Sequence, residues 1–295
     1  MEERRFGPIR FLPGDRGGRY PHCHSLFIEG AGILVDPGSQ RDRLRRLASS
    51  GEVREVWLSH WHEDHFMHLD LFEGIPLRIS EVDAPPLADI ETFLDWYGLE
   101  GDAYRGYWRN ELLGRFHYRS RKPAGYLREC GNFSPGAAAI EILATPGHTP
   151  GHLALHFPAE GVLFLGDYDL SPFGPWYGDL YSSIEDTLAS LSRLKRIPAR
   201  VLVTGHEKGI FEEPLPENLW RKYEDVIRIR EEKLVEVLKK PLTLEEIAAR
   251  WIVYGKPREP KEFFAFGEKA IMGKHVEHLL RTATVAKTGN RYVLA

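Results

Sequence analysis

One short run of the sequence carries four metal-binding side chains within six residues. His60, His62, Asp64 and His65 form the pattern His-x-His-x-Asp-His. The run follows residues 53–58, whose β-branched and aromatic side chains predict a buried strand. Because residues two apart in an extended chain point the same way, His60 and His62 can hold one cation. The turn that follows can direct Asp64 and His65 toward a second cation.

Three further candidate ligands each come directly after a predicted strand. His148 lies in the repeat Thr-Pro-Gly-His-Thr-Pro-Gly-His, Asp167 ends Phe-Leu-Gly-Asp, and His206 lies in Val-Thr-Gly-His-Glu. Together with the first run they supply five histidines and two aspartates, which is enough for two divalent ions with Asp167 as the bridge. The second histidine of the repeat, His152, is expected to orient a ligand through a hydrogen bond.

Two neighbouring cations would explain why no serine or cysteine nucleophile is needed. Such a pair lowers the pKa of a shared water toward neutrality and polarises a carbonyl or phosphoryl oxygen. Asp167 and Asp64 are therefore the predicted catalytic residues, with Asp64 also relaying a proton to the leaving group. Zinc is the first choice because histidine-rich sites with mixed nitrogen and oxygen ligands suit it, and iron and manganese stay open.

Strand-like and helix-like segments alternate through residues 1–218 and predict an α/β catalytic domain. Residues 84–136 interrupt this alternation with many aromatic side chains. We expect a helix at residues 89–97 and otherwise a long loop over the active site, because long loops in compact domains usually serve function. Within this insert, His117, Tyr118 and Arg119 are candidates for contacting an anionic substrate.

The tail, residues 219–295, differs in character from the rest of the chain. Its pattern predicts three helices, at residues 219–238, 244–251 and 268–282, and then a hairpin, which is the outline of a small winged-helix-like α+β domain. Residues 221–295 carry 16 Lys and Arg against 11 Asp and Glu, whereas the whole chain has a net charge of −4. The tail could bind RNA or join two copies in a homodimer, but a solvated helical surface explains the same charge and is the interpretation that we favour.

The composition of the chain limits the cellular compartment in which we expect it. There are two cysteines, Cys23 and Cys130, and they have neither zinc-finger spacing nor disulfide density, so a reducing cytoplasm is expected. The N-terminus lacks an apolar signal region, and no segment reaches the roughly 18 apolar residues of a membrane span. We therefore expect a small-molecule substrate and no membrane partner.

The four ligand-bearing blocks, in this order, resemble the metallo-β-lactamase superfamily. The resemblance covers about residues 9–210 and implies a four-layer αβ/βα sandwich with a dinuclear centre at one edge. It also implies a division of the ligands between two ions. The first ion would be bound by His60, His62 and His148, the second by Asp64, His65 and His206, and both by Asp167.

The sequence resembles individual branches of the superfamily to different degrees. The repeat at residues 145–152 and the Gly-His-Glu at residues 205–207 are similar to glyoxalase II and its thioesterase relatives. The tail resembles the winged-helix tail of the metallo-β-lactamase-like endoribonucleases. We favour hydrolysis of a small ester, thioester or lactone. The alternatives are cleavage of single-stranded RNA and a mononuclear iron dioxygenase acting on persulfides.

Overall fold

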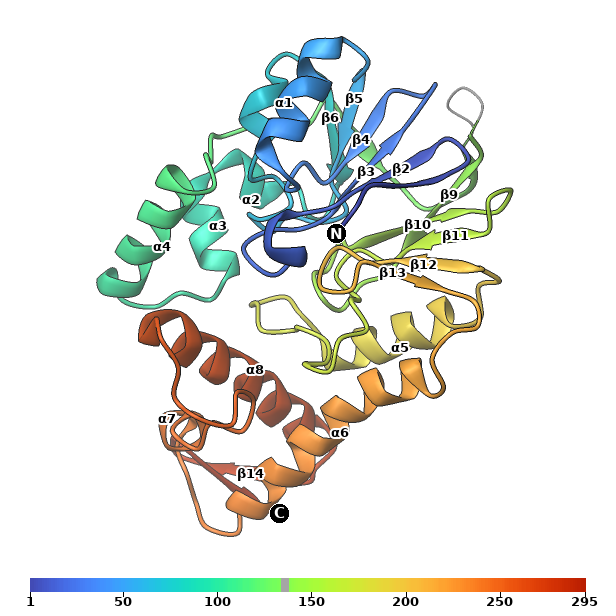
Figure 1. Cartoon of the computed structure of the whole chain (residues 1–295). Helices are drawn as coiled ribbons and strands as arrows, with labels where there is room; N and C mark the ends of the chain where they lie inside the picture. Colours follow the sequence, from blue (N-terminus) through green and yellow to red (C-terminus); the bar gives the residue numbers. More distant parts are fainter. Residues whose placement is uncertain (134–137) are drawn as a thin grey trace.

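Two β-sheets form the centre of the protein in the computed structural model, which describes residues 1–133 and 138–295. The first sheet contains, in spatial order, β1 (Arg4–Phe6), β2 (Ile9–Leu12), β3 (Ser25–Ile28), β4 (Ile33–Val35), β5 (Glu55–Trp57), β6 (Leu77–Ser80) and β7 (Gly125–Leu127). The second contains β13 (Ile210–Glu212), β12 (Val201–Val203), β11 (Val162–Phe164), β10 (Leu153–Phe157), β9 (Ile140–Ala144) and β8 (Cys130–Phe133). The sheets lie face to face (Figure 1).

Alternating side chains along each strand build the layers. In β4, Ile33 and Val35 join the core between the two sheets, whereas Leu34 packs on the opposite face with α1 (Arg41–Ser50). In β11, Leu163 likewise faces outward and packs with α5 (Ile184–Leu194). Each sheet thus has one inner and one helix-covered face, as the period of two requires. The predicted four-layer αβ/βα sandwich is confirmed.

The insert differs from the prediction of a loop over the active site. Its helix α3 (Ile90–Trp96) matches the helix expected at residues 89–97. The helices α2 (Pro85–Ala88) and α4 (Asp102–Gly114) stand where a loop was expected, and the later part of the insert supplies β7 and β8 to the two sheets. The physical reason is burial, since Trp108 and Leu112 occupy one face of α4 and are almost fully enclosed. Residues 134–136 of the predicted insert lie outside the described residues.

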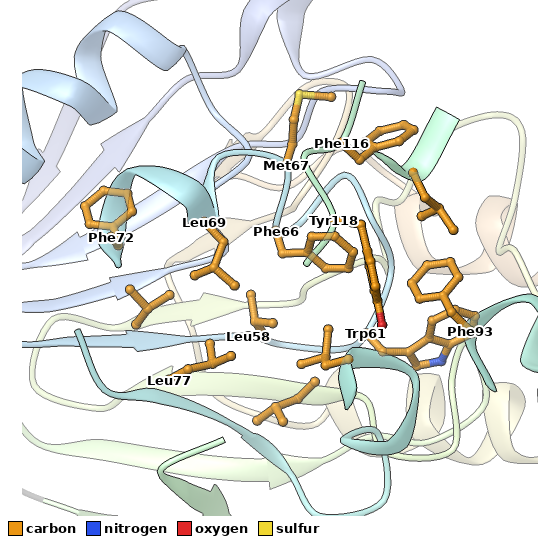
Figure 2. Close-up of a cluster of buried hydrophobic side chains, with 14 of the residues drawn as sticks. Leu58, Trp61, Phe66, Met67, Leu69, Phe72, Leu77, Phe93, Phe116 and Tyr118 are labelled. Atoms are coloured by element: carbon orange, nitrogen blue, oxygen red, sulfur yellow. The ribbon is translucent and has the colours of Figure 1, made fainter. Parts of the chain in front are cut away.

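The insert packs directly behind the histidine run. Figure 2 shows Phe93, Phe116 and Tyr118 of the insert gathered in one buried cluster with Trp61 and Phe66. Two short 3-10 helices, Asp15–Gly17 and Leu69–Phe72, complete this half. The insert is therefore a packed wall beside the site.

The C-terminal part contains α6 (Leu219–Val237), α7 (Leu244–Ala248), α8 (Lys261–Arg281) and a hairpin of β14 (Val285–Thr288) and β15 (Arg291–Leu294). Thr243 and Glu246 form a capping box at the start of α7. The helix α8 begins earlier than predicted because Phe263 and Phe266 pack against aromatic residues of the insert. The winged-helix assignment and the boundary at residue 218 stay predictions.

Within residues 1–133 and 138–295, no helix combines the length and the hydropathy that crossing a bilayer demands.

Candidate metal centre

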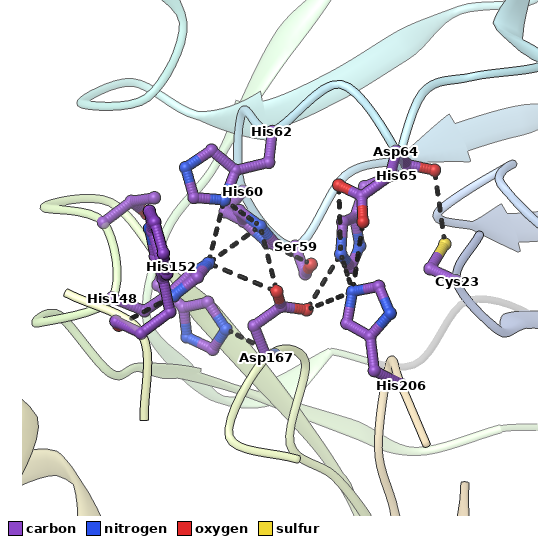
Figure 3. A network of polar contacts seen from close by, with 12 residues as sticks. Cys23, Ser59, His60, His62, Asp64, His65, His148, His152, Asp167 and His206 are labelled. Carbon is purple, nitrogen blue, oxygen red and sulfur yellow. Dashed lines mark hydrogen bonds and ion pairs between the residues drawn. The ribbon is translucent and has the colours of Figure 1, made fainter. Parts of the chain in front are cut away.

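Seven predicted ligands meet where strands of both sheets end (Figure 3). The histidine run follows β5, Asp167 follows β11, and His206 follows β12. His148 lies in the connection between β9 and β10. The structure sorts these residues into two groups, and in each the candidate ligand atoms lie within 4.8 Å of one another. The first group is His60, His62, His148 and Asp167, and the second is Asp64, His65 and His206.

Three imidazole nitrogens converge in the first group. His62 Nδ1 lies 3.0 Å from His60 Nε2 and 2.9 Å from His148 Nε2, and the two Nε2 atoms are 3.1 Å apart. In the second group, His206 Nε2 lies 3.3 Å from His65 Nε2 and 3.2 Å from Asp64 Oδ2. Imidazole nitrogens and a carboxylate oxygen around a common point form the donor set that zinc takes in proteins.

Asp167 lies between the two groups and turns one oxygen toward each. Its Oδ1 atom is 2.8 Å from His65 Nε2 and 3.4 Å from His206 Nε2. Its Oδ2 atom is 3.3 Å from His148 Nε2. The Oδ1 atom is buried and has no hydrogen-bond partner among the described residues. Buried polar atoms are rarely left without a partner, so this oxygen fits a cation ligand.

Acceptors on the far side of the imidazole rings fix which nitrogen carries the proton. His62 Nε2 donates to Asp179 Oδ2 at 2.7 Å, and His148 Nδ1 donates to the main-chain oxygen of Trp176 at 3.1 Å. The nitrogen of each ring that faces the group is then a lone-pair donor. Several lone pairs converging on one point repel each other unless a cation or proton lies between them, so the residues fit a bound metal.

Asp36 supports ligands of both groups at once. Its Oδ2 atom lies 3.0 Å from His65 Nδ1 and accepts a hydrogen bond from Ser59 Oγ at 2.7 Å. Ser59 Oγ in turn lies 2.9 Å from His60 Nδ1. A single buried carboxylate at the end of β4 therefore orients one histidine of each group.

The charges of the site suit a cation. Burial lowers the pKa of His148 to about 3, so this ring stays neutral. Burial raises the pKa of Asp167, but the histidines around it, His65 first, bring it well below its ordinary value. Burial also lowers the pKa of His62, but Asp179 raises it to about 9, so a cation at this ring would displace a proton. Burial likewise lowers the pKa values of His65 and His206, but Asp167 raises both well above the ordinary value. A cation would therefore displace protons from these rings as well, because neutral imidazoles are the form that binds metal.

His152, which is expected to orient a ligand, contacts the main chain of Asp167. Its Nε2 atom accepts a hydrogen bond from the Asp167 main-chain N–H at 3.2 Å, and its Nδ1 atom lies 2.8 Å from Thr145 Oγ1. Gly166 precedes Asp167 with a φ of +54°, and a Cβ atom there would lie 2.4 Å from His152 Nε2. Only glycine lets the main chain approach this ring in that conformation.

The predicted substrate residues do not join the two groups. Tyr118 is a core residue with 5% of its surface exposed, and its hydroxyl donates to a main-chain oxygen, so the prediction of a substrate contact is wrong for it. Arg119 pairs with Glu73 on the surface, and His117 Nδ1 donates to a main-chain oxygen. Because the insert forms helices, these side chains contact other residues and not the two groups of ligands.

Sequence reasoning missed the carboxylates that support the ligands. Asp36 follows a predicted strand just as Asp167 does, and that position could have identified it. Asp179 and Glu63 carried no such signal, although Glu63 is fully buried and accepts hydrogen bonds from the hydroxyls of Tyr20 and Tyr97. Their partners come from segments remote in the chain.

Comparisons with known proteins agree with this geometry. The sequence model of the metallo-beta-lactamase superfamily matches residues 18–206. A hydroxyacylglutathione hydrolase from Fuscovulum blasticum is 29% identical over 181 residues, which are 60% of this chain and 58% of that protein. A beta-lactamase-like protein 2 homolog from Caenorhabditis elegans is 25% identical over 235 residues, which are 76% of this chain and 68% of the homolog. The chain thus spans less than two thirds of the length of the hydrolase that it matches.

Solved structures extend the similarity to the C-terminal part. A metallo-beta-lactamase family protein from Thermus thermophilus superimposes with a TM-score of 0.74 at 25% identity, covering 98% of this chain and 99% of the other. A beta-lactamase domain protein from Burkholderia ambifaria gives a TM-score of 0.66 at 19% identity, covering 100% and 94%. The predicted fold is confirmed by this similarity. The chain belongs to the metallo-beta-lactamase superfamily.

Proposed function

We propose that the protein hydrolyses a small-molecule thioester, ester or lactone with two divalent cations, zinc being the first choice. The observation that carries the proposal is the orientation of Asp167, whose two oxygens face different groups of ligands at 2.8 Å and 3.3 Å. A carboxylate that serves a single ion has no need of this arrangement. The names of the curated relatives, hydroxyacylglutathione hydrolases, support a thioester as the first substrate class to test.

Each ligand has a defined task in this proposal. His60, His62 and His148 would hold one ion and Asp64, His65 and His206 the other, with Asp167 shared. When bound, such a pair lowers the pKa of a water toward neutrality and polarises the scissile carbonyl. Asp64, which is almost fully buried, would take up a proton from the attacking water and return it to the leaving group.

The C-terminal charges favour a small molecule over RNA. Arg281 pairs with Glu185 at 2.7 Å, and Arg291 pairs with Glu246 at 2.8 Å. Basic side chains held by neighbouring acids have less charge to offer a phosphate backbone. Cleavage of single-stranded RNA is therefore the second choice, and a persulfide dioxygenase with one iron is the third.

The test combines metal analysis with turnover by the full chain on a thioester, a lactone and a short RNA. We expect two ions per chain, thioester or lactone hydrolysis, and loss of turnover in a folded Asp167→Ala variant. Asp95→Ala is the matched control, because Asp95 is exposed and pairs with Arg105. One iron per chain with oxygen uptake would replace the proposal by the dioxygenase. RNA cleavage that weakens steeply with salt would replace it by the nuclease.

A further inference from the structure

The segment of residues 173–182 accepts hydrogen bonds from two histidines of the first group, through the ring nitrogens that face away from the group. Asp179 Oδ2 accepts from His62 Nε2, and the main-chain oxygen of Trp176 accepts from His148 Nδ1. Ser182 Oγ also donates to the main-chain oxygen of His148 at 2.7 Å. The position of this segment therefore decides where two of the three imidazoles of the first group point.

A buried arginine of α6 holds the beginning of the same segment. Arg230, with 3% of its surface exposed, donates to the main-chain oxygen of Phe173 at 2.7 Å and to that of Pro175 at 3.2 Å. It also donates to the hydroxyl of Tyr177 at 3.0 Å. A guanidinium with several fixed donors locks the main chain as one unit.

The helix α8 holds the rest of the segment. Lys274 Nζ donates to the main-chain oxygen of Leu180 at 2.7 Å, and its side chain is 9% exposed. His275 Nε2 lies 2.9 Å from the Tyr177 hydroxyl.

Small residues on α8 let the segment approach closely. A Cβ atom on Gly267 of α8 would lie 3.2 Å from the ring of Trp176. A Cβ atom on Gly178 of the segment would lie 3.2 Å from the Ala270 Cβ atom of α8. Because both approaches are close, little free space remains between the segment and α8.

The histidines of the second group make their supporting contacts to other parts of the chain. His65 Nδ1 lies 3.0 Å from Asp36 Oδ2, and His206 Nδ1 donates to the main-chain oxygen of Gly18 at 2.7 Å. These supports come from the first sheet and its loops. Tyr223 of α6 does donate to the Asp167 main-chain oxygen at 3.3 Å, but Asp167 is shared by both groups.

We propose that α6 and α8 position the ligands of the first group through the 173–182 segment, so that occupancy of this group depends on the C-terminal helices. Lys274 and Tyr177 are positioning residues in this arrangement, since neither is a ligand. The inference rests on the proposed dinuclear function. It gives the C-terminal part a task within the same chain that needs neither RNA nor a second copy.

The experiment is a zinc titration of the full-length protein against a chelator, with site occupancies from anomalous diffraction at limiting zinc. Lys274→Met removes the donor to Leu180 and keeps an unbranched side chain. Tyr177→Phe removes a single oxygen atom. In both variants we expect about 10-fold weaker binding of one ion, lost from the His60, His62 and His148 group, because supporting contacts affect metal affinity to this degree. The second group should keep wild-type occupancy.

Lys269→Met is the control, because Lys269 lies on the same helix with its side chain 43% exposed and pairs with Glu245. It should bind both ions as the wild type does. If Lys274→Met fails to fold, Tyr177→Phe decides the matter. Unchanged affinity in the variants, or equal weakening of both ions, would overturn the inference. A wild-type protein that binds fewer than two ions would instead overturn the proposed function.

Discussion

Asp179 Oδ2 lies 2.7 Å from His62 Nε2, although 117 residues separate the two side chains in the sequence. Both are buried, and the contact crosses from the histidine run to the segment before α5. A carboxylate in this place fixes the ring so that Nδ1 faces the first group, and it makes that nitrogen a stronger donor to a cation.

Replacing Asp179 should weaken the binding of the ion in the first group, and alanine should weaken it more than asparagine does. Asp179→Asn keeps an oxygen that can accept from His62 and loses the charge, whereas Asp179→Ala loses both. We expect zinc affinity to fall about 10-fold in the first variant and about 100-fold in the second, measured by chelator competition. Asp42→Asn, at a side chain 81% exposed, serves as the control. Equal affinities in all four proteins would contradict the role given to Asp179.

Gly166→Ala should damage the site more than an ordinary glycine substitution does. A positive φ costs alanine about 1–2 kcal/mol wherever it occurs. At residue 166 the new Cβ atom would also lie 2.4 Å from His152 Nε2 and push that ring from the Asp167 main chain. Gly98→Ala is the matched control, since Gly98 has a φ of +70° and no atom near its Cβ position.

Chemical denaturation and zinc binding distinguish the two glycine variants. Gly98→Ala should lose only the backbone contribution to the free energy of unfolding and keep both ions. Gly166→Ala should lose more stability and also bind zinc more weakly. The same loss of stability in both, with full zinc binding, would show that His152 tolerates the methyl group.

The sequence predicts most of the fold because short apolar runs alternate with amphipathic helical segments. The strands β11 and β12 are continuous apolar runs because both of their faces are buried, with Leu163 and Leu202 facing the outer layer and their neighbours facing the inner core. The short strands β1 and β13 were missed because one end of each is polar and exposed. The helix α4 was missed because Gly106 and several charges hide its two buried positions, Trp108 and Leu112.

The ligands could be predicted from the sequence, whereas the residues that support them through hydrogen bonds could not. Asp167 and His206 follow the neighbouring parallel strands β11 and β12, so the sheet brings their side chains to one edge. Asp179 lies in a segment with no regular structure, and its partner depends on how α6 and α8 hold that segment. Tyr118 shows the converse, because an aromatic residue beside arginines looks the same in sequence whether it is buried or exposed.

Asp83 should make stability fall as the pH rises toward neutrality. It is fully buried and accepts hydrogen bonds from Thr149 Oγ1 and the Gly151 main chain, which follow His148 in the sequence. Burial raises its pKa from 3.8 to about 7, against the effect of these hydrogen bonds. Because the folded state holds the proton more tightly, the stabilisation is complete below pH 4 and is lost as the pH rises through about 7.

Asp83→Asn tests this in the metal-free protein by denaturant unfolding at several pH values. The difference in unfolding free energy between the variant and the wild type should shift in favour of the variant by up to about 4 kcal/mol between pH 4 and pH 8. Taking the difference removes the contributions of the buried histidines, whose pKa values are shifted in both directions: that of His148 is lowered and that of His62 is raised. A difference independent of pH would show that Asp83 is ionised throughout.

Trp61 should connect the stability of the core to the metal site. It alternates with His60 and His62, points into the cluster of Figure 2, and packs edge-on against Phe93 at 4.7 Å. Trp61→Ala would leave a large cavity and lower the free energy of unfolding by about 3–5 kcal/mol. It should also weaken zinc binding, because the strand end that holds the two histidines loses its anchor.

Trp61→Phe separates volume from hydrogen bonding at this position. The indole N–H has no hydrogen-bond partner among the described residues, so removing it forfeits no contact. The phenyl ring fills most of the space, and we expect a loss well below that of the alanine variant, with zinc binding near that of the wild type. If phenylalanine were as damaging as alanine in both measurements, the indole itself, and not the filled volume behind the histidines, would be what the site requires.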